Sequence, residues 1–295
     1  MRSRSLLAAV VAATALGACG GASNGSAPEA PSSFNTPFAD ERVYPTFVSA
    51  EVTVGPNRFL VGLLNDKDAP VGSPDVRMNI AFFDLDRSAS EPVSRTTMRW
   101  MWITRPYLGL YRGRVSFDHP GEWGAEVVVE GRGLDETVRA SFDVRAETST
   151  PGLGERVPAS KTPTADDPRG IRRISTDPDP IPRLYEVSVA EALDAHEPFV
   201  VVFATPKFCS SQVCGPMLDN VKMVAERHPG ITFIHVEPYE LPADAANLEP
   251  VEAALEWGLP SEPWTFVVNG RGRLAAKFEG ALAPGELSAE LKRLR

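Results

Sequence analysis

Hydrophobic and polar residues alternate in two different ways along this chain, and the change falls near residue 185. From about residue 43 to residue 145, short apolar segments of period two are separated by turn residues. We predict strands in seven of these segments: Phe47–Val54, Phe59–Leu64, Val76–Phe83, Arg99–Ile103, Leu110–Phe117, Trp123–Glu130 and Val138–Val144. Short strands at a spacing of about ten residues are typical of a β-sandwich. Residues 43–145 are therefore expected to form an all-β domain.

After residue 185, helical and strand patterns alternate. Ser188 and Glu191 have capping-box spacing and predict the start of a short helix. Phe199–Ala204 is a continuous apolar run, which is typical of a strand buried on both faces. The rest of the pattern predicts, in order, a helix over 215–227, a strand over 231–237, a helix over 250–257, strands over 264–268 and 274–278, and a helix over 284–294. Residues 186–295 are therefore expected to form an α/β domain.

Residues 146–185 separate the two patterns. This stretch contains seven prolines, with Thr, Ser, Asp and Arg between them. Such a composition predicts a semi-rigid linker between two domains.

The N-terminus carries a targeting signal. Arg2 and Arg4 precede an apolar run over 6–16, which is shorter than the roughly 20 residues needed to span a bilayer. The run ends in Leu16-Gly17-Ala18-Cys19, which resembles the lipobox of bacterial lipoproteins. The resemblance implies that residues 1–18 are removed as a signal peptide and that Cys19 receives a lipid. The alternative is an ordinary secretory signal, in which Cys19 has no role.

Residues 19–42 are expected to form a flexible tether, because Gly, Ser, Ala, Asn and Pro dominate them. The protein is thus predicted to lie outside the cytoplasm, anchored to the membrane by lipid alone, where disulfides persist. The whole chain has 295 residues and a net charge of −9, which argues against a nucleic-acid partner. Loss of Arg2 and Arg4 with the signal peptide makes the mature chain more acidic still.

The all-β region contains few candidate catalytic or metal-binding residues. Its hairpin around Tyr111–Phe117, Asp118-His119-Pro120-Gly121 and Trp123 resembles that of Ig-like domains in bacterial secreted proteins, which implies a fold and no activity. A copper site could use His119 with Met78, Met98 and Met101, but methionines on strands are usually core residues. Asp84-Leu85-Asp86 lacks calcium-loop spacing and is interpreted as a solvated turn. We therefore assign no metal site.

Cys209 and Cys214 are the remaining cysteines of the three in the chain, too few for a disulfide-built scaffold or a Cys₄ zinc site. They follow the strand predicted at 199–204 and precede a helix, a position where ligands collect in open α/β sheets. Residues five apart in one helix are too distant to form a disulfide, so Cys209 is expected in the loop and Cys214 near the helix start. There the helix dipole lowers a thiol pKa, and Lys207 adds a positive charge nearby.

These residues resemble the thioredoxin superfamily over about residues 187–295. Phe203–Cys209 looks like the approach to a thioredoxin active site, and Cys214-Gly215-Pro216 looks like part of its motif. Glu262–Val268 is similar to the segment that carries a cis-proline, here Pro263. The resemblance implies a thioredoxin-like fold, catalytic Cys209 and Cys214, and a partner site at Phe208, Pro263 and Trp264.

The chain also departs from that family. Four residues separate the cysteines instead of two, and the order in which the cysteines act stays open. The strand before the motif lacks the family's buried acid, which leaves His235 on the next strand as a candidate titratable group.

Three functions remain in competition. The favoured one is a thiol–disulfide oxidoreductase that acts on extracytoplasmic protein thiols or disulfides and needs no cofactor. The second is a binding module in which the disulfide is only structural. The third is a Sco-like copper chaperone, which is disfavoured because His235 lies only 21 residues after Cys214. No nucleophile elbow or phosphate-binding glycine loop follows any predicted strand, so hydrolase and nucleotide functions have no support.

Overall fold

The computed structural model describes residues 34, 42–166, 170–209 and 213–294. The predicted signal peptide, the lipidation site Cys19 and most of the predicted tether lie outside these residues. Within the described ranges, no helix is both long enough and apolar enough to cross a membrane. The described residues belong to one compact unit, which contains an antiparallel β part and a mixed α/β part.

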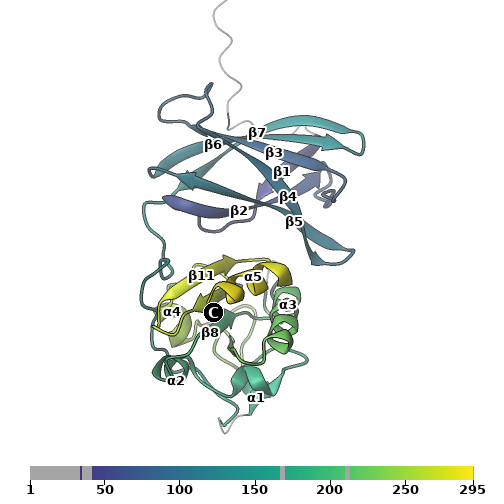
Figure 1. Cartoon of the computed structure of the whole chain (residues 1–295). Helices are drawn as coiled ribbons and strands as arrows, with labels where there is room; N and C mark the ends of the chain where they lie inside the picture. Colours follow the sequence, from purple (N-terminus) through teal and green to yellow (C-terminus); the bar gives the residue numbers. More distant parts are fainter. Residues whose placement is uncertain (1–33, 35–41, 167–169, 210–212, 295) are drawn as a thin grey trace, which may run out of the picture. The chain divides into compact units, whose positions relative to one another are not determined.

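The β part is a single antiparallel sheet of seven strands (Figure 1). The strands are β1 (Val43–Phe47), β2 (Gly55–Asn65), β3 (Arg77–Asp84), β4 (Ser94–Thr104), β5 (Leu108–Phe117), β6 (Gly121–Gly131) and β7 (Leu134–Val144). Their order is β1-β2-β5-β4-β3-β6-β7. The two end strands approach each other, since the rings of Phe47 on β1 and Phe142 on β7 are 5.4 Å apart. The sheet is therefore nearly closed into a barrel.

Alternating burial explains why these strands form. On β6, Trp123, Ala125, Val127 and Val129 are buried, while Glu122, Glu126 and Val128 are more exposed. A cluster of aromatic rings fills the interior, in which Phe82 and Phe142 each contact Phe59 and Phe117. Complete burial of one such side chain contributes about 2–3 kcal/mol. The expected all-β character is confirmed.

Two features of the β part differ from the expectation. The strands form one sheet because β4 pairs with both β3 and β5, instead of two sheets stacked face to face. The first strand was placed wrongly, since it covers Val43–Phe47 and not Phe47–Val54. The sequence pattern misses it because Pro45 interrupts it. A proline is tolerated there because β1 pairs with β2 alone and forms an end of the sheet.

The α/β part is built on a sheet of four strands. The strands are β8 (Phe199–Phe203), β9 (Thr232–Val236), β10 (Trp264–Val268) and β11 (Leu274–Glu279), in the order β11-β10-β8-β9. Only the β8–β9 pair is parallel. The helices are α1 (Ile171–Ile174), the 3₁₀ helix η1 (Pro182–Tyr185), α2 (Val189–Asp194), α3 (Cys214–Arg227), α4 (Glu252–Glu256) and α5 (Pro284–Arg293). Every helix and strand predicted after residue 185 is present, within two residues at nearly every boundary.

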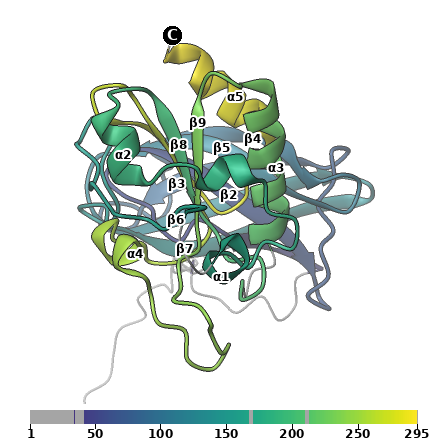
Figure 2. The same ribbon diagram turned by 90° about the horizontal axis from the view of Figure 1, so that it is seen from below.

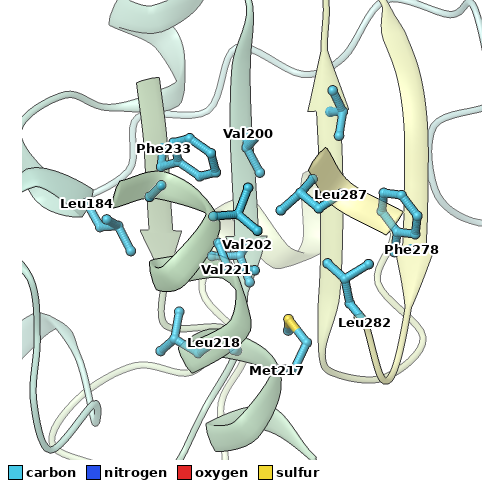
Figure 3. Packing of buried hydrophobic residues seen from close by; sticks show 14 of the residues in the cluster. Leu184, Val200, Val202, Met217, Leu218, Val221, Phe233, Phe278, Leu282 and Leu287 are labelled. Carbon is cyan, nitrogen blue, oxygen red and sulfur yellow. The ribbon is translucent and has the colours of Figure 1, made fainter. Parts of the chain in front are cut away.

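Helices cover both faces of this sheet. Figure 2 shows α3 and α5 on one side of β8 and β9, and α2 and α4 on the other. On the first face, Val200 and Val202 of β8 belong to one apolar cluster with side chains of α3 and α5, namely Met217, Leu218, Val221 and Leu287 (Figure 3). The second face packs Phe203 and Phe266 against Trp257. All five residues of β8 are buried because both faces are covered, as its continuous apolar sequence predicts.

The proline-rich stretch 146–185 is more ordered than a free linker. Val157 is buried in the second face of the α/β part, and its amide donates to Gly272 O at 3.1 Å. The indole of Trp257 donates to Ser160 Oγ at 3.1 Å. Helices α1 and η1 also lie in this stretch. The composition does not predict this, because these contacts are made with residues about 100 positions away in the sequence.

Candidate functional site

The two cysteines form a disulfide at the junction of β8 and α3. Their Cα atoms are 6.0 Å apart, which is a normal separation for a disulfide. Cys214 is the first residue of α3 and has no exposed surface. Cys209 lies in the loop that follows β8 and is half-buried. The placement expected from the spacing, with Cys209 in the loop and Cys214 at the helix start, is found.

Backbone hydrogen bonds around the disulfide distinguish the two cysteines. The amide of Cys214 donates to Cys209 Sγ at 3.3 Å, so the first N–H of α3 points at the loop cysteine. The amide of Cys209 donates to Thr205 O at 3.1 Å, which holds the loop against the end of β8. An N–H at a helix N-terminus stabilises negative charge. Cys209 therefore combines solvent access with a thiolate-stabilising donor, and Cys214 is shielded.

A carboxylate also reaches the disulfide. One oxygen of Glu262 and the sulfurs of Cys209 and Cys214 all lie within 4.8 Å of one another. Glu262 precedes Pro263, and the peptide bond between them is cis. Tyr239 donates its hydroxyl to Glu262 Oε2 at 2.7 Å, and burial together with this carboxylate raises the pKa of Tyr239. The sequence reasoning missed Glu262 as a site residue, although its position before Pro263 was the available signal.

A second acid, Glu237, lies directly after β9. It is 5% exposed, and burial raises its pKa. Its Oε2 accepts from the amide and the hydroxyl of Thr176, each at 2.7 Å. Its Oε1 is buried and has no hydrogen-bond partner among the described residues.

His235 is engaged in packing on β9. Its Nδ1 lies 2.7 Å from the hydroxyl of Tyr185, and its Nε2 lies 2.9 Å from Ala204 O. Complete burial lowers the pKa of His235 to about 4, so the ring is neutral at pH 7. His235 does not belong to the group formed by the cysteines and Glu262. The carboxylate that is grouped with the two sulfurs is that of Glu262.

The other expected site residues differ in how far they are exposed to solvent. Lys207 is exposed, with its Nζ 5.0 Å from the ring centre of Phe208, in the loop that carries Cys209. Pro263 is buried beside Glu262. Trp264 is only 2% exposed and stacks on Phe266 at 5.6 Å, so its side chain belongs to the core. Phe208 is half-buried in the loop and directly precedes Cys209.

A cavity of about 580 Å³ lies elsewhere in the compact unit, between β2 and β5 and the segment formed by β11 and α5. Neither cysteine is among its described lining residues. Ion pairs form within it, among them Arg58 with Glu286 at 2.8 Å and Lys277 with Glu51 at 3.4 Å. Burial raises the pKa of Glu279 in this cavity to about 7.

Comparisons with known proteins name no family. No family model matches the chain, and no curated protein matches it. Among solved structures, a DUF4426 family protein from Pseudomonas aeruginosa PAO1 is similar at 10% identity and a TM-score of 0.26, covering 36% of this chain and 91% of the other. A putative glycoside hydrolase from Bacteroides vulgatus ATCC 8482 is similar at 14% identity and a TM-score of 0.23, covering 50% of this chain and 26% of the other. At these TM-scores neither similarity supports an argument about fold or function.

Proposed function

We propose that this protein is a thiol–disulfide oxidoreductase with a thioredoxin-like α/β domain. It acts on protein thiols or disulfides outside the cytoplasm, tethered to the membrane through a lipid on Cys19. The observation that carries the proposal is the asymmetric disulfide at the start of α3, with an accessible Cys209 and a shielded Cys214. A purely structural disulfide needs neither the access nor the helix N–H that points at one sulfur.

The arrangement of strands supports the thioredoxin-like class. Parallel β8 and β9 are followed by antiparallel β10 and β11, with the cysteines between β8 and α3 and Pro263 immediately before β10. The family resemblance of the sequence implies this order. The β part carries the Ig-like resemblance, and we assign it the role of presenting the redox domain.

The asymmetry assigns an order to the two thiols. In the reduced protein, the thiolate of Cys209 attacks a partner disulfide, forms a mixed disulfide and releases the first partner thiolate. Cys214 then loses its proton and attacks Cys209 Sγ, which releases the second partner thiolate and closes the Cys209–Cys214 disulfide. The partner disulfide gains the two electrons that the cysteine pair loses. Glu262, with a carboxylate oxygen within 4.8 Å of both sulfurs, accepts the Cys214 proton in this scheme.

Trapping of the mixed disulfide tests both the activity and the order of attack. We expect Cys214→Ser to accumulate a covalent adduct with a model disulfide, such as a peptide whose cysteine carries a thionitrobenzoate group. The adduct persists because the resolving thiol is missing. The matched variant Cys209→Ser should trap at least tenfold less, since Cys214 has no exposed surface. Equal trapping by the two variants would refute the proposed order.

The reduction potential of the pair separates activity from a structural role. Structural disulfides in secreted proteins lie below about −300 mV, whereas catalytic ones lie higher. We expect a value above that limit, together with reduction of a model disulfide by the reduced protein. A value below the limit with no exchange would leave the binding-module alternative. Stoichiometric Cu(I) binding by the reduced protein, lost in Cys209→Ser, would instead favour the copper chaperone.

A further inference from the structure

A second group of potential ligands lies in the β part. Asp84, Asp86 and His119 each offer one ligand atom, and these atoms all lie within 4.8 Å of one another. Asp84 ends β3 and His119 lies in the turn between β5 and β6. The pairing of β3 with β6 brings the turns together, because Asp84 lies opposite Trp123 and the amide of Leu85 donates to Glu122 O at 3.3 Å.

His119 is oriented by a carboxylate on its other ring nitrogen. Its Nδ1 lies 2.8 Å from Asp118 Oδ1, and its Nε2 lies 3.4 Å from Asp84 Oδ1. The ring also packs against Trp123, with the ring centres 5.1 Å apart. Histidines that bind metals ordinarily have a carboxylate or carbonyl on the distal nitrogen, which fixes the ring and its tautomer. The nitrogen that faces Asp84 is therefore the one available to a metal.

Asp84 is a buried carboxylate that an exposed arginine neutralises, and its Oδ1 accepts from the amide of Asp86 at 3.2 Å. Its side chain is 3% exposed, and its buried Oδ2 has no hydrogen bond among the described residues. This oxygen forms an ion pair with Arg87 Nε at 3.0 Å, and the Arg87 side chain is 65% exposed. A buried carboxylate is costly unless hydrogen bonds or a cation satisfy it. Arg87 is exposed enough to move away when another cation arrives.

The charges around the group favour a cation. Asp84, Asp86 and Asp118 are three acidic side chains, and Arg87 is a nearby base that pairs with Asp84 and Asp118. Asp86 is exposed and its Oδ2 lies 2.7 Å from the position that a Cβ on Gly121 would take, so the carboxylate lies over the glycine backbone. Solvent can therefore reach the group from the Asp86 side.

We propose that Asp84, Asp86 and His119 bind a divalent transition-metal ion, with Zn²⁺ as the ion that suits them best. One imidazole and two carboxylates are common zinc ligands and leave a fourth position for water. The ion displaces Arg87 from Asp84 and links the turn after β3 to the turn before β6. The site is independent of the disulfide, since neither cysteine belongs to the group.

Calorimetric titration of the oxidised full chain in mild detergent with Zn²⁺ tests the proposal, because cysteines held in a disulfide are not zinc ligands. We expect one ion per chain, and at least a tenfold loss of affinity in Asp86→Asn and in His119→Gln. Arg87→Gln should bind more tightly, since it removes the competing cation. His196→Asn, which changes an exposed histidine outside the group, should bind as the unchanged chain does.

Several results would overturn the assignment. One is the absence of saturable Zn²⁺ binding up to millimolar concentrations, and another is equal affinity in the chain and in both ligand variants. Tighter binding of Ca²⁺ than of Zn²⁺ would overturn the choice of a transition metal. Asp86→Asn keeps the test valid if His119→Gln fails to fold, because Asp86 is exposed and its loss leaves the core intact.

Discussion

Replacement of Glu262 by Gln removes a negative charge from the immediate surroundings of both sulfurs while keeping the shape of the side chain. A carboxylate oxygen within 4.8 Å destabilises a thiolate by about 3 kcal/mol at an effective dielectric constant of 20 and by about 1 kcal/mol in water. Cys209 and Glu262 are both half-buried, so the effect should lie toward the lower value. We expect the pKa of the Cys209 thiol to fall by about one unit, because one unit corresponds to about 1.4 kcal/mol.

The same change should raise the reduction potential of the pair. A more stable thiolate favours the reduced form, and about 1.4 kcal/mol corresponds to about 30 mV for a two-electron couple. Ultraviolet thiolate absorbance against pH measures the first quantity in the reduced protein, and equilibration with glutathione measures the second. Glu226→Gln is the matched control, since Glu226 is an exposed residue of α3. An unchanged or higher Cys209 pKa in Glu262→Gln, or an equal fall in the control, would refute the electrostatic argument.

Three further predictions concern stability. Reduction of the disulfide should lower the free energy of unfolding by about 2 kcal/mol, because the disulfide closes a loop of only a few residues. Denaturant titration with and without reductant measures the loss, and a loss above about 4 kcal/mol would contradict the prediction. The folded-state pKa of His235, about 4, lies below its unfolded value of about 6.5, so the unfolded chain binds the extra proton between these pH values. The free energy of unfolding should therefore fall by roughly 3 kcal/mol in total as pH drops through this window, and the fall should be smaller in His235→Gln. Parallel curves of unfolding free energy against pH for the two proteins would refute the role given to His235. Phe82→Ala should lower the free energy of unfolding by about 3–5 kcal/mol, because this fully buried ring contacts three other phenylalanines. Val93→Ala, at an exposed position, should lower it by less than about 1 kcal/mol in the same denaturant titration.

Local patterns predicted the α/β part closely because each of its elements is specified by neighbouring residues. The capping box at Ser188 and Glu191 is formed as the spacing predicts. The continuous apolar run of β8 is buried on both faces, and α3 begins at Cys214 as the disulfide geometry requires. These features depend on backbone hydrogen bonding and on burial, and both can be inferred over a few residues.

The β part was harder because its strands are stabilised by distant partners. Alternation located six of the seven strands, but it carries no information on which strand pairs with which. Whether seven such strands form one sheet or two depends on pairing across the fold, here on β4 joining β3 to β5. Pro45 concealed β1 because a proline is acceptable only where a strand has an unpaired edge, which no local pattern reveals.

The sequence by itself determined the cysteine pair, its position between a buried strand and a helix, and the order of elements around it, because these follow from spacing and periodicity. Only the tertiary structure decided which sulfur is accessible and which carboxylate lies beside it. It also showed that His235 is held in the core by Tyr185 and that two turns bring Asp84 and His119 together. Strand pairing and packing bring together side chains that are far apart in sequence. Their burial, charge state and reactivity depend on these tertiary contacts.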